Sequence, residues 1–235
     1  MTAHPVRIIV RRSLNLSKTY VLLSIAIAAN GILVSSFGDT LERGPKIAED
    51  VDVQPALPLL AIPLLTTSAL TLSIPVILLF VYDKNNGVLE RFLSLGMNQA
   101  DIYRRYLKAS VLLTLVFLPV ALASNMLAGF LNGTNTDILL QVSGLIVLFT
   151  FSVVTLVTIS MMTFSSLQKE RVGASQPIGV GIGGLVLLPN YVIPFAWPLQ
   201  YAVYLEFVLG LAIGGVSILL LFLSSRLINR EKLLP

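Results

Sequence analysis

The side chains that could do chemistry in this sequence are few, and those that catalysis usually needs are scarce. Cysteine is absent and His4 is the only histidine. These counts argue against a thiolate nucleophile, a Ser-His intramembrane protease, a haem-binding span and a zinc site. The chain also lacks the GxxxxGK[ST] phosphate loop, so we expect no ATP hydrolysis by this chain itself. We therefore expect no enzyme activity and no cofactor or metal in this chain.

Polar groups that could contact a passing solute occur inside two long apolar segments. Glu206 lies a few residues into the last of them, where an ionisable group is a functional candidate unless it reaches the lipid headgroups. Hydroxyl side chains concentrate in the second segment, which also carries three prolines. Proline frees backbone carbonyls, which nearby hydroxyl side chains can satisfy. The hydroxyl run therefore either lines a translocation path or joins packed helices. The candidate path residues are Thr66, Thr67, Ser68, Thr71, Ser73 and Glu206.

The stretch LLPNYVIPFAWPLQY is also unusual, because Pro189, Pro194 and Pro198 fall close together in it. Three prolines argue against a continuous helix, so we expect a short broken or re-entrant element at the outer surface. Aromatic residues of the same stretch fit the belt that forms at a membrane interface. These are Tyr191, Trp197 and Tyr201.

The composition shows what must position these groups. Hydrophobic residues make up 55% of the 235-residue chain and charged residues only 12%, against about 25% in a soluble domain. Uncharged apolar stretches of the length that crosses a bilayer recur. We therefore expect an all-α polytopic membrane protein in which residues 1–235 form a single transmembrane domain. The six expected spans cover about 19–37, 57–81, 109–131, 138–164, 174–196 and 201–225.

The basic residues predict the orientation of the spans. Of the 16 Lys and Arg residues, all but Arg43 and Lys46 fall before the first span, in the second-to-third and fourth-to-fifth loops, or after the sixth span. This bias predicts that both termini are cytoplasmic. It also accounts for the net charge of +4, so we expect no nucleic acid partner.

The segment before the first span has the pattern of an amphipathic helix. Its apolar residues fall on one helical face and its cations on another, which predicts a basic helix lying in the membrane interface. A simple topology anchor is equally compatible with the pattern. The apolar face comprises Val6, Ile9, Val10 and Leu14, and the basic face Arg7, Arg11 and Lys18.

The loop 82–108, YDKNNGVLERFLSLGMNQADIYRRYLK, carries the signals of two helices. Asp83, Asn85 and Asn86 are capping residues before a first helix, and Gly96 suits the left-handed stop after it. A second helix starts near Asn98 and continues into the third span. An exposed apolar stripe along the first helix predicts a docking surface for a partner protein or for lipid headgroups. The stripe comprises Val88, Leu89, Phe92, Leu93 and Leu95.

This loop resembles the second-to-third loop of type-2 ABC exporter permeases, whose Gly-Thr-Leu-Glu motif reads Gly87-Val88-Leu89-Glu90 here. The stretch PLQYAVYLE is similar to the family's Pro-x-x-Tyr-Ala pattern before the sixth span. The resemblance implies a permease of the cell membrane that works as a homodimer or heterodimer, and a loop that acts as the coupling helix. A separate ATP-binding cassette ATPase would bind this helix and hold ATP and Mg. Helical spacing adds Phe92 and Leu93 to the motif residues.

Two other classes of function remain open from the sequence. An ATP-independent carrier would show inverted repeats and midplane carboxylates, and neither is obvious. A membrane scaffold similar in layout to the cytochrome c maturation permease would use the loop to bind an assembly partner. The neutral path candidates favour a lipid-like, peptide or drug-like cargo over a small ion.

Overall fold

A computed structural model describes residues 4–16, 20, 22–27, 57–131, 133–167 and 175–227. Within these ranges the regular elements are helices, with no strand. Residues 22–27 form a short helical stretch. The labelled elements are α1 (His4–Leu16), η1 (Leu57–Leu60), α3 (Ala61–Asn85), α4 (Val88–Ser94), α5 (Gln99–Leu131), α6 (Thr136–Leu167), α7 (Ser175–Ala196) and α8 (Leu199–Leu227).

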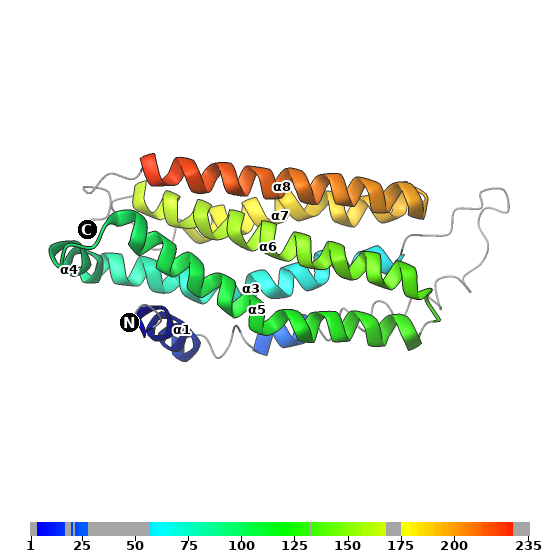
Figure 1. The fold of residues 1–235 in the computed structure, drawn as a ribbon, viewed down its shortest axis with the longest axis horizontal. Coiled ribbons are helices and arrows are strands. Elements are labelled where there is room, and N and C mark those ends of the chain that lie inside the picture. Colours follow the sequence, from blue (N-terminus) through cyan, green and yellow to red (C-terminus); the bar gives the residue numbers. More distant parts are fainter. Residues whose placement is uncertain are drawn as a thin grey trace.

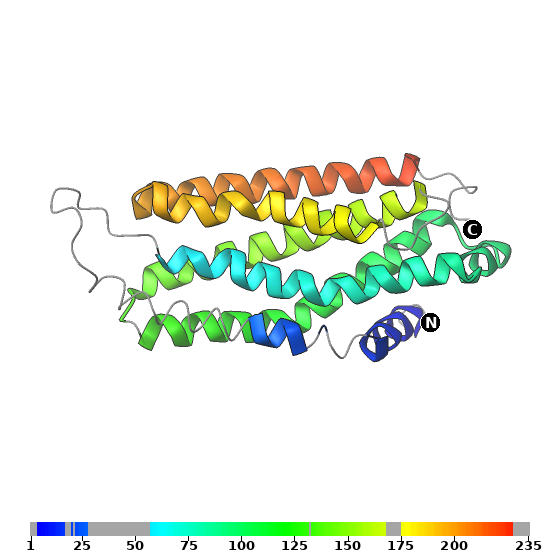
Figure 2. The same ribbon diagram turned by 180° about the vertical axis from the view of Figure 1, so that it is seen from behind.

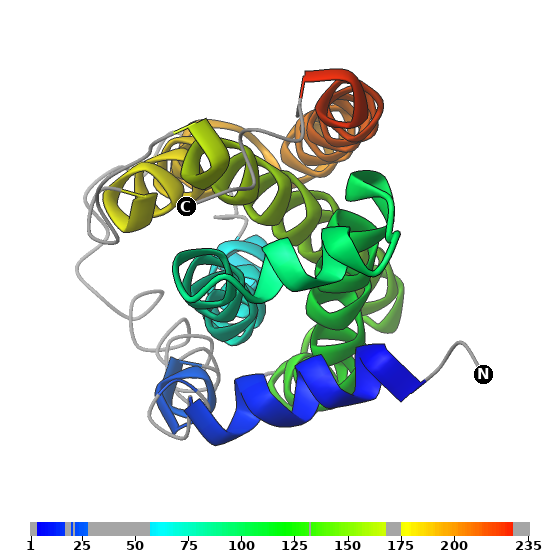
Figure 3. The same ribbon diagram turned by 90° about the vertical axis from the view of Figure 1, so that its left-hand side faces the viewer.

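The long helices α3, α5, α6, α7 and α8 run side by side along one axis, as Figures 1 and 2 show. The end of α3, α4, the start of α5, the end of α6 and the end of α8 lie together, and we call this the α4 end of the bundle. Seen along the bundle axis, α1 lies crosswise against the bundle (Figure 3). This is the orientation expected of a helix in the plane of a membrane interface.

Four helices are long and apolar enough to cross a bilayer by length and composition: α3, α5, the stretch Thr136–Thr163 of α6, and Leu199–Leu223 of α8. They correspond to the second, third, fourth and sixth expected spans. The fold is therefore that of a helical membrane protein. The fifth expected span coincides with α7, whose stretch Gly181–Ala196 is apolar but shorter than the other four. The first expected span falls mostly outside the described residues.

Two boundaries differ from the sequence-based expectation. Helix α3 continues past residue 81 to Asn85, so Asp83 lies inside a helix and does not cap one. The expected broken or re-entrant outer element is also wrong, because α7 runs through Pro189 and Pro194 to Ala196. Membrane helices tolerate proline because neighbouring groups satisfy the freed carbonyls. Between α7 and α8 the helical path is interrupted at residues 197–198.

Small residues let α8 approach α6 closely. A Cβ added at Gly210 would lie 2.7 Å from Leu148 Cδ2, and one at Gly214 would lie 3.1 Å from Ser152 Oγ. The Ser217 hydroxyl donates a 2.8 Å hydrogen bond to the carbonyl of Ser152. The two glycines thus form a tight helix interface of the small-xxx-small type.

Two hydrophobic clusters hold the bundle together. The larger cluster joins α3, α5, α6, α7 and α8 along the bundle and includes Leu65, Phe149 and Val153. The smaller cluster, which we call the second cluster, lies at the α4 end and joins α1, α3, α4 and α5, together with Met162 of α6. The second cluster therefore fixes α1 and α4 to the long helices.

Candidate functional site

The candidate site is α4 with the polar and aromatic groups beneath it. Gly87 precedes α4 with φ +69°, and Gly96 follows it with φ +81°, so both need the left-handed conformation that glycine adopts without strain. The amide of Met97 bonds to the carbonyl of Phe92, and the amide of Gly96 bonds to that of Leu93. This is a Schellman motif, and it confirms the expected helix stop at Gly96.

The predicted apolar stripe of α4 is largely covered by the bundle. Leu89 is fully buried and Leu93 is 7% exposed, both within the second cluster. Val88 and Phe92 are half-buried. The expectation of an exposed stripe is therefore wrong for the two leucines, because their burial is what attaches this seven-residue helix to α3 and α5.

The solvent-facing side of α4 has a different composition. Glu90 and Arg91 are exposed, as are Ser94 and Leu95 after them. Leu95 is 76% exposed, although it is a large apolar side chain. Of the predicted coupling residues, Glu90 alone is exposed, while Gly87, Val88 and Phe92 are half-buried. We call Glu90, Arg91, Ser94 and Leu95 the outer face of α4.

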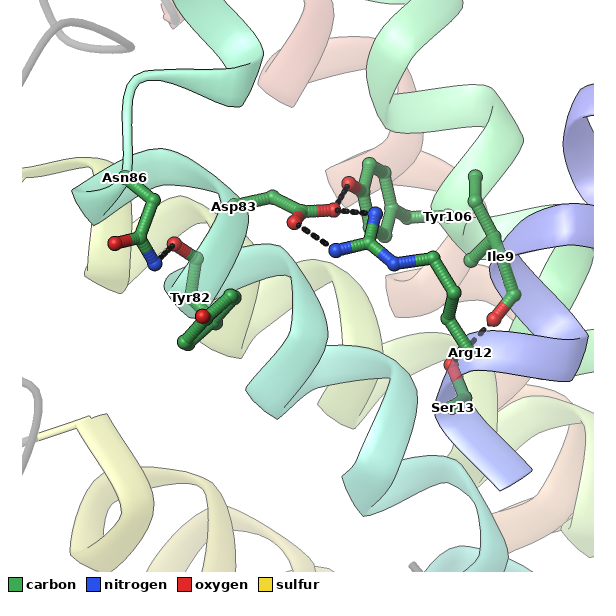
Figure 4. A network of polar contacts seen from close by, with 7 residues as sticks. All are labelled: Ile9, Arg12, Ser13, Tyr82, Asp83, Asn86 and Tyr106. Atoms are coloured by element: carbon green, nitrogen blue, oxygen red, sulfur yellow. Dashed lines mark hydrogen bonds and ion pairs between the residues drawn. The ribbon is translucent and has the colours of Figure 1, made fainter. Parts of the chain in front are cut away.

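A partly buried ion pair lies just before α4, at the end of α3. Arg12 of α1 donates to both carboxylate oxygens of Asp83, at 3.1 Å and 2.8 Å (Figure 4). Asp83 is fully buried and also accepts a hydrogen bond from the Tyr106 hydroxyl of α5. Three helices therefore meet at one carboxylate, and its burial is compensated by a charged partner and a neutral donor.

Aromatic contacts extend from Tyr106, the residue that donates to Asp83. Phe80 of α3 makes edge-to-face contacts with Tyr103 and Tyr106, each with ring centroids 5.2 Å apart. The Tyr103 hydroxyl donates a 3.0 Å hydrogen bond to the carbonyl of Met162 in α6. These contacts connect α6 to the group of residues that already joins α1, α3 and α5. All the helices that contribute to the second cluster apart from α4 itself are therefore linked by polar or aromatic contacts near α4.

Sequence reasoning missed Arg12 and Tyr106 as site residues and assigned Asp83 to a cap. The sequence did carry one signal: Asp83 is a carboxylate at the end of a largely apolar helix. A buried charge at such a position needs a partner. The sequence did not identify that partner, which is 71 residues away.

The predicted path residues of α3 are mostly buried and engaged. Thr67 and Thr71 each donate to the carbonyl four residues earlier, and Ser73 donates to Leu70. Ser68 and Ser24 exchange hydrogen bonds between hydroxyls and carbonyls, which joins α3 to the stretch 22–27. The hydroxyl run thus serves local backbone bonding and helix packing in this chain.

Several buried polar groups of the described part of the bundle have no hydrogen-bond partner there. These atoms include the Thr66 hydroxyl, the Asn190 carboxamide and both carboxylate oxygens of Glu206. Glu206 is fully buried on α8, so its carboxylate is enclosed by the bundle and is not exposed on its surface. An unpartnered carboxyl inside a span is unfavourable, which marks it as a candidate for binding a proton or a cation.

Comparison with protein-family models, curated proteins and solved structures returned no match for the chain. The function proposed below therefore rests on the residues and the geometry of this chain.

Proposed function

We propose that the chain is the permease subunit of an ATP-driven exporter and that the outer face of α4 binds a separate ATP-binding cassette ATPase. The observation that carries the proposal is the attachment of α4. It is braced by Leu89 and Leu93 and adjoins the Arg12–Asp83 pair, yet it presents charges and an exposed Leu95 to solvent. A helix built this way suits transmission of force from a partner to the spans.

The finer features of the proposal follow from the sequence pattern. In this proposal the chain has six spans in the cell membrane with both termini cytoplasmic, because the cations concentrate on that side. Two permease chains and two ATPases form one transporter, as in the family that the loop resembles. ATP and Mg belong to the ATPase, and the cargo is lipid-like, peptide or drug-like.

The geometry suggests how coupling works. When two ATPases close on ATP, each would move the α4 that it holds. Leu89 and Leu93 pass this movement to the second cluster, and the Asp83 carboxylate carries it to α1 through Arg12. Because α3 ends two residues after Asp83, the same movement reorients a membrane-spanning helix.

Co-purification tests this assignment. The tagged full chain is purified from its native membrane, and hydrolysis of MgATP is measured in the eluate, with mass spectrometry to identify an ATP-binding cassette ATPase. We expect hydrolysis with the wild type and loss with Leu95→Asp, which places a charge on the outer face of α4. The control is Leu131→Asp, since Leu131 is 71% exposed at the opposite end of the bundle. No hydrolysis with the wild type, or equal hydrolysis with both variants, would contradict the proposal.

The state of Glu206 favours a second candidate, an ATP-independent carrier driven by protons. A buried carboxyl with no partner among the described residues is a group that carriers use to bind a coupling ion. The purified chain is reconstituted into vesicles with a pH gradient and without ATP, and an internal dye reports proton entry. Proton entry that Glu206→Gln abolishes would favour the carrier, whereas no entry with the wild type would exclude it.

A further inference from the structure

We propose that the groove between α6 and α8 binds a neutral or zwitterionic phospholipid at the end of the bundle opposite α4. The groove has a volume of about 650 Å³, within the range of roughly 300–1,000 Å³ for small-molecule sites. It lies along two helices that are long and apolar enough to cross a bilayer. The proposal goes beyond the transport assignment and holds for either candidate function.

The lining of the groove changes from polar to apolar with depth. Gln141 lies near the start of α6 and Gln200 near the start of α8, so both amides are at the end opposite α4. Leu145 and Leu148 line the groove one and two turns deeper on α6, and Phe207 lines it two turns deeper on α8. This order matches an amphiphile whose headgroup stays at the surface and whose acyl chain enters the bilayer.

A separate observation places the polar end of the groove at the headgroup level. Trp197, Tyr201 and Tyr204 are 49%, 65% and 65% exposed, and they cluster where α7 passes into α8. Exposed tryptophan and tyrosine at a helix end are typical of the membrane–water interface. Gln200 lies within this cluster, so its amide is positioned to hydrogen-bond with a phosphate or ester oxygen.

The absence of charge selects the class of lipid. The nine residues that line the groove include no Asp, Glu, Lys, Arg or His. An anionic headgroup would find no cation among these nine residues, whereas the two amides can both donate and accept. A peptide is less suitable, because its backbone groups would lie unpaired against the apolar part of the lining.

Gly144 gives a way to fill the groove without disturbing the helix interface. It lines the groove, is exposed, and has nothing within 4 Å of an added Cβ. Gly215 of α8 is also exposed with nothing within 4 Å, but it is outside the groove. Gly144→Phe and Gly215→Phe are therefore a matched pair of variants that differ in whether the ring occupies the groove.

The experiment uses the purified full chain and a phosphatidylcholine with a photoreactive diazirine in its acyl chain. After irradiation, adducts are mapped by proteolysis and mass spectrometry. We expect wild-type adducts on both groove helices, near Leu145 and Phe207. Gly144→Phe should lower their yield about tenfold, the effect of losing burial of roughly two methylene groups, and Gly215→Phe should leave it unchanged. Equal yields in all three proteins, or adducts spread evenly over the exposed helices, would overturn the proposal.

Two further measurements keep the test decisive. If Gly144→Phe does not fold, Gly144→Cys is labelled after purification with a bulky maleimide, because the chain has no other cysteine. The same tenfold loss is expected, and an unchanged yield would overturn the proposal. Leu140→Cys tests a second copy as occupant, since Leu140 is 57% exposed in the groove. A disulfide-linked dimer without groove adducts would also overturn it.

Discussion

Arg12 and Asp83 form a two-point ion pair in which the Asp83 side chain is fully buried and the Arg12 side chain is 41% exposed. The pair joins the crosswise helix α1 to the last turn of α3. Because Asp83 lies within five residues of the start of α4, α1 and α4 share one anchoring point. Helix α1 is therefore part of the same structural unit as the proposed docking helix α4.

Removing the cation should destabilise this unit. Arg12→Met leaves the Asp83 carboxylate buried with only the Tyr106 hydroxyl as partner, so we expect a loss of about 1–3 kcal/mol in the free energy of unfolding. The measurement is SDS titration in mixed micelles. Arg11→Met is the control, because Arg11 is exposed on the same helix. Equal losses in both variants would show that the ion pair contributes nothing specific.

The double variant Arg12→Met with Asp83→Leu should recover most of the lost stability. It removes both charges, so no unpaired carboxylate remains buried at the end of α3. Additive losses in the double variant would contradict coupling between the two side chains. The same titration measures the wild type, the single variants Arg12→Met and Asp83→Leu, and the double variant.

The attachment of α4 should depend on Leu89. Leu89→Ala removes a fully buried side chain, and we expect a loss of about 2–5 kcal/mol in the free energy of unfolding. Leu95→Ala, on the exposed side, should change it by less than about 0.5 kcal/mol. A small effect at Leu89 would mean that α4 is not packed on the bundle as described.

The contact between α6 and α8 should not tolerate a larger residue at Gly210. Gly210→Val places methyl groups against Leu148 and Phe149, which costs about 1–3 kcal/mol in the free energy of unfolding. Gly215→Val is the control, because it changes helix propensity in the same way at a position with nothing within 4 Å of an added Cβ. The difference in stability between the two variants therefore measures the steric effect at Gly210. If the two variants were equally stable, the helices would not be in the close contact found here.

Glu206 should reduce stability in the isolated chain. Replacing a buried carboxyl that lacks a partner among the described residues by an apolar residue of similar length is expected to stabilise the fold by about 1–3 kcal/mol. Glu206→Met is therefore expected to raise the free energy of unfolding, whereas Glu206→Gln, which retains a polar group, should give no such gain. A less stable Glu206→Met protein would indicate that a partner satisfies the carboxyl.

The features that could be predicted from the sequence are those set by local pattern. Apolar length predicted the spans that α3, α5, α6 and α8 occupy, and Gly96 predicted the end of α4. Each of these signals acts over a few turns of one helix. The sequence therefore predicts the helices themselves but not the contacts between them.

The features that could not be predicted depend on contacts between distant residues. Asp83 looks like a helix cap locally, and only the approach of Arg12 makes its burial favourable. Leu89 lies on an apolar stripe that could pack against a partner or against the chain's own helices. In the structure it is buried against the chain's own helices. The outer prolines at 189 and 194 suggested a break, but α7 accommodates them within one helix.

The continuity of α3 has a mechanical consequence. Its 25 residues form one rod of about 37 Å, and Asp83 ties the rod to α1 two residues before its end. Tilting such a rod by about 5° around its midpoint shifts its two ends by roughly 2 Å in opposite directions. With such a tilt, a displacement at α4 would move the far end of α3 in the opposite direction. Ser68, which bonds to Ser24, lies closer to the midpoint of the helix than to either end.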